Sequence, residues 1–148
     1  MKITVINGPN LNMLGCREPE IYGEKSYEEL EKFIEDYAEK KGVEAIVLQS
    51  NGEGEIIDFI QYAQNTCDGI IINPCAYTHY SYAIYDALKM AEIPCVEVHL
   101  SDITKREEFR KVSVTAPACD LQIYGKGFSG YADAVDYIIK KVKDNEKQ

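Results

Sequence analysis

Short apolar runs that alternate with amphipathic segments are the feature that most constrains how this chain can fold. Five runs have the length and composition of β-strands: Ile3–Ile6, Ala45–Leu48, Gly69–Ile72, Cys95–Val98 and Leu121–Tyr124. They are nearly continuous in apolar residues, which is typical of parallel strands buried on both faces of a sheet. Apolar residues recur at helical spacing over Ser26–Lys41, Glu53–Gln64, Tyr80–Ala91, Ser129–Val142 and, more briefly, Lys105–Arg110. The alternation predicts an open, doubly wound α/β fold with a five-stranded parallel sheet and helices on both faces.

Two of the expected helices carry signals for their first turn. Ser26 is followed three residues later by Glu29, which is the spacing of a capping box. Thr78 precedes the third helical segment and is the expected cap there.

Length, charge and cysteine usage limit the classes of protein to which the chain can belong. The 148 residues fit a single domain, residues 1–148. The formal net charge of −9 at pH 7 disfavours nucleic acid and anionic membranes as partners. No apolar run approaches the ~20 residues of a membrane span, and the first residues lack the apolar core of a signal peptide. Five cysteines without a CxxC pair argue against a disulfide framework or a zinc site and indicate reduced thiols in a cytoplasm.

Polar residues gather directly after the predicted strands. Four such segments stand out: Asn7–Asn12, Gln49–Glu53, Asn73–His79 and Glu97–Asp102. Both histidines of the chain, His79 and His99, lie in them. In doubly wound sheets, ligands bind outside the carboxyl ends of the strands. We therefore expect a polar site at this edge, where Asn10 and Asn73 are either ligand contacts or plain turn residues.

Glu97 and His99 form the most suggestive pair in that set. They lie two residues apart on a strand and so share a face. A carboxylate at that position fixes the tautomer of the imidazole and raises its basicity, as a general acid or base requires. The alternative is a structural pair at the end of the strand.

Three other kinds of site find little support. A metal site needs three or four ligands, and the chain offers only two histidines and no cysteine cluster in its sequence. Ser81, His79 and Asp86 lack the GxSxG elbow of a serine hydrolase. The glycines at positions 8, 15 and 23 do not form the GxGxxG pattern of a dinucleotide site.

The arginines are few, and their positions are informative. The chain has three, Arg17, Arg106 and Arg110. Arg106 and Arg110 are four residues apart and are expected on one helical face, as an anion clamp or as part of a solvated charged helix. Arg17 and Tyr22 fall in an irregular stretch, residues 11–25, which has the character of a lid that closes over a small anionic substrate.

Four long segments together resemble the type II 3-dehydroquinate dehydratases: INGPNLNMLGCREPEIYG, QSNGEGEIIDFIQ, GIIINPCAYTHYSYAIYDAL and PCVEVHLSDITKREEFR. The similarity runs from about Ile3 to the last helix. It implies a flavodoxin-like fold and the reversible dehydration of 3-dehydroquinate to 3-dehydroshikimate. It also implies no metal, no organic cofactor, and a homododecamer built as a tetramer of trimers.

The resemblance assigns proton transfer to two residues of this chain. Tyr22 matches the general base, with Arg17 beside it, and His99 matches the general acid, with Glu97 as its partner. Asn10 matches the residue that helps to hold a water at the enolate oxygen.

The remaining family positions concern binding. Substrate contacts are implied for five residues: Asn73, His79, Leu100, Ser101 and Arg110. Leu100 and Ser101 would offer backbone amides to the substrate carboxylate. Arg106 matches a position that supports the lid, and Asp86 an acid that reaches the site of a neighbouring subunit.

Three positions depart from the usual family pattern. Gly52 stands where histidine is usual, Tyr85 where arginine is common, and Cys75 where a small residue, often glycine, is found. None of them removes a proposed catalytic group, but Gly52 and Tyr85 bear on subunit contacts. The alternatives to a dehydratase are a non-catalytic small-molecule binding module on the same fold and a different hydro-lyase acting on another cyclic hydroxy acid.

Overall fold

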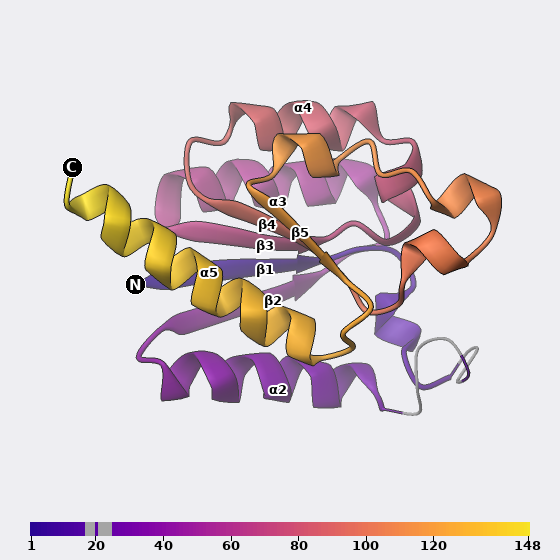
Figure 1. Cartoon of the computed structure of the whole chain (residues 1–148), viewed down its shortest axis with the longest axis horizontal. Coiled ribbons are helices and arrows are strands. Elements are labelled where there is room, and N and C mark those ends of the chain that lie inside the picture. Colours follow the sequence, from indigo (N-terminus) through magenta and orange to yellow (C-terminus); the bar gives the residue numbers. More distant parts are fainter. Residues whose placement is uncertain (17–19, 21–24) are drawn as a thin grey trace.

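The sheet is parallel throughout and has the predicted five strands. The structure is a computed structural model, and it describes residues 1–16, 20 and 25–148. The strands are β1 (Lys2–Asn7), β2 (Glu44–Gln49), β3 (Gly69–Asn73), β4 (Cys95–His99) and β5 (Leu121–Tyr124). Their order in the sheet is β2-β1-β3-β4-β5 (Figure 1). This order confirms the predicted doubly wound, flavodoxin-like fold.

Helices cover both faces of the sheet, and each face has its own core. The helices α2 (Tyr27–Lys40) and α5 (Ser129–Glu146) lie on one face, and α3 (Glu53–Thr66) and α4 (Tyr82–Met90) lie on the other (Figure 1). Ile3 and Val5 of β1 pack into the first core, whereas Ile6 of the same strand packs into the second. Successive residues of a strand point to opposite faces, so both faces need apolar side chains. This explains why the strands read as unbroken apolar runs.

The predicted capping box is present, but the predicted start of α4 is wrong. The Glu29 amide donates to the Ser26 hydroxyl, and the Ser26 amide donates to the Glu29 carboxylate, each at 3.1 Å. The helix α4 begins at Tyr82, and Ser81 is its cap, with its hydroxyl accepting from the Ile84 amide at 3.0 Å. Thr78 instead directs its hydroxyl to two other side chains near the candidate site, so it is not free to cap.

The prediction of a short helix over Lys105–Arg110 is also wrong. That segment contains two separate 3₁₀ turns, Ile103–Lys105 and Glu108–Arg110, with extended backbone at Arg106 (φ −101°, ψ −161°) between them. Asp102 accepts a hydrogen bond from the Thr104 amide at 2.9 Å and thereby closes a local turn. A helix of six residues returns few hydrogen bonds for the cost of its first turn, so the local turns prevail.

The junction after β1 brings two loops together at the carboxyl edge of the sheet. Strands β1 and β3 are neighbours, with Asn7 opposite Asn73. The Gly8 amide donates to the Asn73 carbonyl at 2.8 Å. A Cβ atom at Gly8 would lie 2.6 Å from the Pro74 carbonyl oxygen, closer than atoms can approach. Glycine is therefore required at this point for the loop after β1 to pack against the loop after β3.

The substitution Gly8→Ala is expected to destabilise the fold by about 1–3 kcal/mol, because the backbone of one loop must shift. Urea denaturation followed by circular dichroism measures the change. Gly54→Ala is the matched control, since a Cβ there has nothing within 4 Å and lies in the first turn of α3. That control is expected to be neutral or to stabilise by about 0.5–1 kcal/mol. Equal effects of the two substitutions would contradict the packing argument.

No helix in the part of the chain that the structure describes is long and apolar enough to cross a membrane.

Candidate active site

A pocket of about 240 Å³ lies at the carboxyl ends of the strands, where the sequence predicts a site. Its lining comes from the last residues of β3 and β4 and from the segments after β1, β3 and β4: Pro9, Asn10, Leu11, Leu14, Asn73, Cys75, Ala76, His79, His99, Leu100, Ser101, Ile103, Arg106 and Arg110. No Asp or Glu occurs among these described lining residues, although the chain as a whole carries a net charge of −9. The pocket therefore concentrates cationic and neutral polar groups and is suited to an anion.

His99 lines this pocket and is paired, as predicted, with Glu97, which is fully buried. The His99 Nε2 lies 2.9 Å from the Glu97 Oε2, and the two residues are 5% and 0% exposed. A carboxylate can only accept, so Nε2 carries the hydrogen of this bond. The other ring nitrogen, Nδ1, has no hydrogen-bond partner among the described residues, and His99 lines the pocket. The geometry leaves Nδ1 as the atom that can exchange a proton with a ligand.

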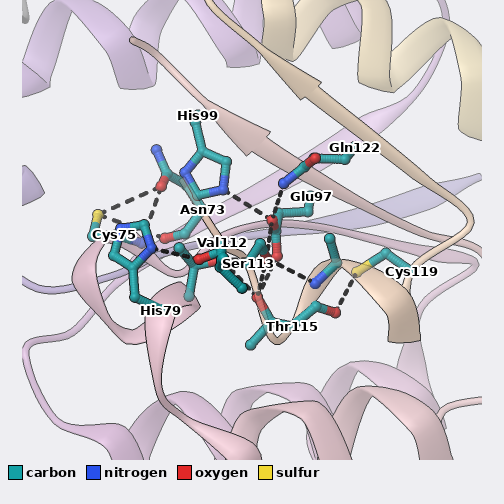
Figure 2. A network of polar contacts seen from close by, with 12 residues as sticks. Asn73, Cys75, His79, Glu97, His99, Val112, Ser113, Thr115, Cys119 and Gln122 are labelled. Atoms are coloured by element: carbon teal, nitrogen blue, oxygen red, sulfur yellow. Dashed lines mark hydrogen bonds and ion pairs between the residues drawn. The ribbon is translucent and has the colours of Figure 1, made fainter. Parts of the chain in front are cut away.

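The Glu97 carboxylate is held by three further donors (Figure 2). Ser113 Oγ and Gln122 Nε2 donate to its Oε2, each at 2.8 Å, and Thr115 Oγ1 donates to its Oε1. Burial alone would raise the pKa of Glu97, but the hydrogen bonds from His99, Thr115 and Gln122 outweigh it and leave the pKa below its usual value of 4.5. Glu97 is therefore ionised at neutral pH and stabilises a positive charge on His99.

We expect Thr115→Val to weaken this arrangement. The buried carboxylate would lose a donor, which costs about 1.5–3 kcal/mol. Because the pKa of Glu97 is lowered in the fold, its ionised form contributes stability above its unfolded pKa, and this contribution is lost as pH falls through the folded pKa. Removing a donor raises the folded pKa, so acid unfolding should begin at a higher pH. Denaturation at pH 7 and an acid titration by circular dichroism measure both effects.

Thr66→Val is the matched control for that experiment. Thr66 also donates its hydroxyl, to the Tyr62 carbonyl at 2.8 Å, but it lies on the exposed surface of α3. Its replacement should leave the acid transition unchanged. A Thr115→Val protein with an unaltered acid transition would contradict the role assigned to the hydroxyl.

Asn73 is positioned by a chain of buried polar groups below the pocket. Its Nδ2 donates to the Tyr131 hydroxyl at 3.0 Å, and that hydroxyl donates to the Asn7 Oδ1 at 2.7 Å. Its Oδ1 accepts from the Cys75 amide at 3.1 Å. Burial raises the pKa of Tyr131 well above its usual range, so this tyrosine stays neutral and serves as a fixed donor and acceptor. The second N–H of the Asn73 amide group remains for a ligand.

Cys75 lies at the pocket with a left-handed backbone (φ 54°). Glycine adopts this conformation at the least cost. The backbone at this position therefore favours glycine, although Cys75 adopts the same conformation here.

The two residues that follow His99 in the pocket lining have backbone amides available as hydrogen-bond donors. The carbonyls of Leu100 and Ser101 accept from Gly127 and Gly125, each at 3.1 Å. Their two amides have no hydrogen-bond partner among the described residues. Both arginines predicted to share a helical face line the pocket, although no helix joins them. Arg110 is held by Glu107 through its Nε.

His79 and Asn10 also line the pocket, as predicted. The His79 Nδ1 contacts the Val112 carbonyl at 2.8 Å, which fixes the ring and leaves Nε2 for a ligand. Burial lowers the pKa of His79, so the ring is neutral at neutral pH. Asn10 has a left-handed backbone (φ 71°), and its amide donates to Asn51 at 2.9 Å.

Glu97 contacts His99 but does not itself line the pocket, and three further predicted site residues are not among its lining. Asp86 lies on the exposed surface of α4 and does not line the pocket. Arg17 and Tyr22, the predicted lid arginine and general base, lie outside the described residues.

Sequence reasoning missed the residues that hold Glu97. Ser113, Thr115 and Gln122 come from the segment after the arginines and from β5, far from Glu97 in sequence. One signal was available, because a glutamate in the middle of a buried strand needs donors. The sequence alone does not show which hydroxyls supply them. Among the described residues, no group of three or more metal-binding side chains is assembled.

A doubly wound domain whose pocket joins a carboxylate-bound histidine, two arginines and free backbone amides has the features of an enzyme that acts on a small anion. Comparisons with known proteins identify which one. The sequence model of the family described as Dehydroquinase class II matches residues 1–139. The chain is 66% identical over 131 residues to the 3-dehydroquinate dehydratase of Clostridium acetobutylicum, which is 88% of this chain and 91% of that protein. It is 56% identical over 144 residues to the enzyme of the same name from Thermotoga maritima, which is 97% of this chain and 99% of that protein.

The fold is similar to solved structures as well. The crystal structure of the type II dehydroquinase from Butyrivibrio crossotus matches with a TM-score of 0.92 and 55% sequence identity, over 93% of this chain and 97% of that one. The chain therefore belongs to the dehydroquinase class II family. Its activity is that of a 3-dehydroquinate dehydratase, a hydro-lyase of the shikimate pathway.

Proposed function

We propose that the chain dehydrates 3-dehydroquinate by an anti elimination that passes through an enolate, with His99 as general acid and Tyr22 as general base. The single observation that carries the proposal is the Glu97–His99 pair, which is buried in the pocket wall and leaves Nδ1 open to a ligand. The reaction removes a proton from the carbon next to a ketone and expels a hydroxyl from the β carbon. It therefore needs both a base and an acid in one small site.

The acid step follows from the pair. Protonated on both ring nitrogens, His99 keeps one N–H on Glu97 and offers the other to the leaving hydroxyl. The ionised carboxylate stabilises that imidazolium, so the proton is available when the carbon–oxygen bond breaks. Expelling water in this way avoids the release of hydroxide.

The base step is assigned to Tyr22, with Arg17 as its activating cation. A tyrosine in water has a pKa of about 10, and bringing a phenol to about 7 requires roughly 4 kcal/mol in favour of the phenolate. One cation at ~4 Å in an effective dielectric of ~20 supplies an energy of that order. Arginine suits the role because it keeps its charge in a closed site. Asn10, which lines the pocket, is proposed to hold a water at the enolate oxygen.

The substrate carboxylate is proposed to bind to the backbone amides that follow His99 and to Arg110. The amides of Leu100 and Ser101 have no other hydrogen-bond partner among the described residues, and Arg110 lies in the same pocket. Asn73, held by Tyr131 and the Cys75 amide, and His79, held by the Val112 carbonyl, are proposed to contact the substrate hydroxyls. Arg106 is proposed to support the lid. No metal or organic cofactor enters this mechanism.

We further propose that the chain is one domain, residues 1–148, which assembles in the cytoplasm as a dodecamer of four trimers. The exposed position of Asp86 on α4 allows it to reach the site of a neighbouring subunit. Gly52 caps α3, and Tyr85 lies half-buried on α4, so both departures from the family pattern lie outside the pocket lining.

The test is to incubate purified protein with 3-dehydroquinate and to follow the ultraviolet absorbance of the conjugated enone product. We expect absorbance to rise with the wild type and to be nearly lost with His99→Ala. A folded wild-type protein that binds 3-dehydroquinate without any rise in absorbance would favour a non-catalytic binding module instead. A mass measurement in solution on the same sample tests the dodecamer.

A further inference from the structure

Two cysteines that the proposed reaction does not use lie in contact with each other. The Sγ atoms of Cys95 and Cys119 are 3.5 Å apart, and both thiols are free. They are 24 residues apart in sequence, so the fold and not the local chain brings them together. Cys67, by comparison, is buried with its Sγ against the hydroxyl of Thr4 at 2.9 Å.

The backbone around the pair is held at a spacing that a disulfide can bridge. The Cys95 amide donates to the Asp120 carboxylate, and the Asp120 amide donates to the Cys95 carbonyl, each at 2.8 Å. These bonds extend the parallel pairing of β4 and β5 by one step below Val96 and Leu121. Asp120 thus lies opposite Cys95, and Cys119 is one residue further along the chain. With neighbouring strands about 4.8 Å apart and a rise of ~3.3 Å per residue, the diagonal between Cys95 and Cys119 is about 5.8 Å, within the ~4.4–6.8 Å between Cα atoms that a disulfide joins. The sulfur atoms need to approach by about 1.5 Å to reach the ~2.05 Å of an S–S bond, which side-chain rotation supplies.

The pair is accessible to a small oxidant. Cys119 is partly exposed, whereas Cys95 is 2% exposed. A second hollow of about 200 Å³ is lined by Cys95, Ala118 and Asp120, so small molecules can come near the buried thiol. The hydrogen bond with Cys119 and burial raise the pKa of the Cys95 thiol, so Cys119 is the thiol that meets the oxidant first.

We infer that Cys95 and Cys119 form an oxidisable thiol pair that a peroxide converts to an intrachain disulfide. The Cys119 sulfur attacks one oxygen of the peroxide, the O–O bond breaks, and the released hydroxide takes the thiol proton to form water. The resulting sulfenic acid is attacked by the Cys95 sulfur, the S–O bond breaks, and the hydroxyl leaves with the second thiol proton as water. Two thiols thus lose two electrons and two protons, and hydrogen peroxide is reduced to two waters.

The disulfide would staple β4 to the segment before β5. It closes a covalent ring that contains His99, both pocket arginines, and the Glu97 donors Ser113 and Thr115. Cys95 begins β4 and His99 ends it, about 13 Å away at ~3.3 Å per residue. The disulfide therefore lies at the end of β4 that is remote from the pocket. It restricts the chain segment that builds the pocket wall without entering the pocket.

The test treats the folded protein with hydrogen peroxide, blocks the remaining thiols with N-ethylmaleimide, and maps a non-reducing digest by mass spectrometry. We expect one cross-linked peptide pair that contains Cys95 and Cys119, with two of the five cysteines protected from alkylation until a reductant is added. The melting temperature should rise by several degrees on oxidation and return on reduction, because the ring restricts the unfolded chain.

Matched variants decide the result. Cys16→Ser removes an exposed thiol and should leave the cross-link and the stabilisation unchanged. Cys119→Ser should abolish both while retaining the dehydratase activity of the reduced wild type, and Cys119→Ala repeats the test if the serine variant folds poorly. Oxidation of Cys119 to a sulfinic acid while Cys95 stays open to alkylation would overturn the inference. A cross-link that forms only in denatured protein would overturn it equally.

Discussion

Replacing His99 by alanine is expected to lower kcat by about 10²–10⁴-fold, the range that general acid catalysis contributes. The physical reason is that Glu97 and its donors hold one imidazole at the pocket, and His79, the other described imidazole there, is held by a backbone carbonyl and not by a carboxylate. Without that imidazole the hydroxyl must leave unprotonated. The KM should change much less than kcat, because the groups proposed to bind the substrate carboxylate remain. Steady-state kinetics by enone absorbance measure both constants.

His79→Ala is the matched control for that prediction. His79 lies in the same pocket, but its Nδ1 is held by the Val112 carbonyl rather than by a carboxylate. Burial lowers its pKa, so it is not a ready proton donor at neutral pH. Its removal is expected to act mainly on KM. If His79→Ala lost as much kcat as His99→Ala, the role of proton donor could not be assigned to His99.

The sequence was sufficient to predict the parts of the fold that depend on periodicity. Buried parallel strands need apolar residues on both faces, so the runs at Gly69–Ile72 and Cys95–Val98 stand out without any structural information. The pair of Glu97 and His99 was equally predictable, because residues two apart on a strand always share a face. The position of the pocket followed from the order of strands and helices.

The rest depended on contacts that no local pattern encodes. Arg106 and Arg110 do meet in one pocket, but through two turns fixed by Asp102 and Glu107 rather than through a helix. Helical spacing thus predicted correctly that the two arginines lie together, although no helix connects them. Thr78 has the sequence of a helix cap, yet its hydroxyl contacts Thr115, which itself donates to Glu97. The hydroxyl of Thr78 bonds to the Thr115 side chain instead of capping the helix. The sequence alone does not show that the two residues lie close together.

Tyr22→Phe carries the second large expected effect, a fall in kcat of about 10²–10⁴-fold, because the phenyl ring has no oxygen to take the proton. The substitution keeps the size and the aromatic character of the side chain, so it should leave the packing of the proposed lid unchanged. Arg17→Ala should also lower kcat, because the phenolate of Tyr22 loses the cation proposed to stabilise it. The loss should be smaller at high pH, where the phenol ionises without that cation. Tyr62→Phe, at a tyrosine that is 65% exposed on α3, is the control and should have normal kinetics.

Exchange of the substrate proton with solvent deuterium distinguishes the base step from the acid step. Loss of turnover does not, because it results when either step fails. If an enolate forms before the hydroxyl leaves, His99→Ala should still exchange the proton next to the substrate ketone with deuterium from D₂O, because its base is intact. Tyr22→Phe should show neither turnover nor exchange. Proton NMR of the substrate in D₂O records both at once. Exchange at the wild-type rate in Tyr22→Phe would assign the base to another residue, and its absence in His99→Ala would mean that proton removal and departure of the hydroxyl occur in one step.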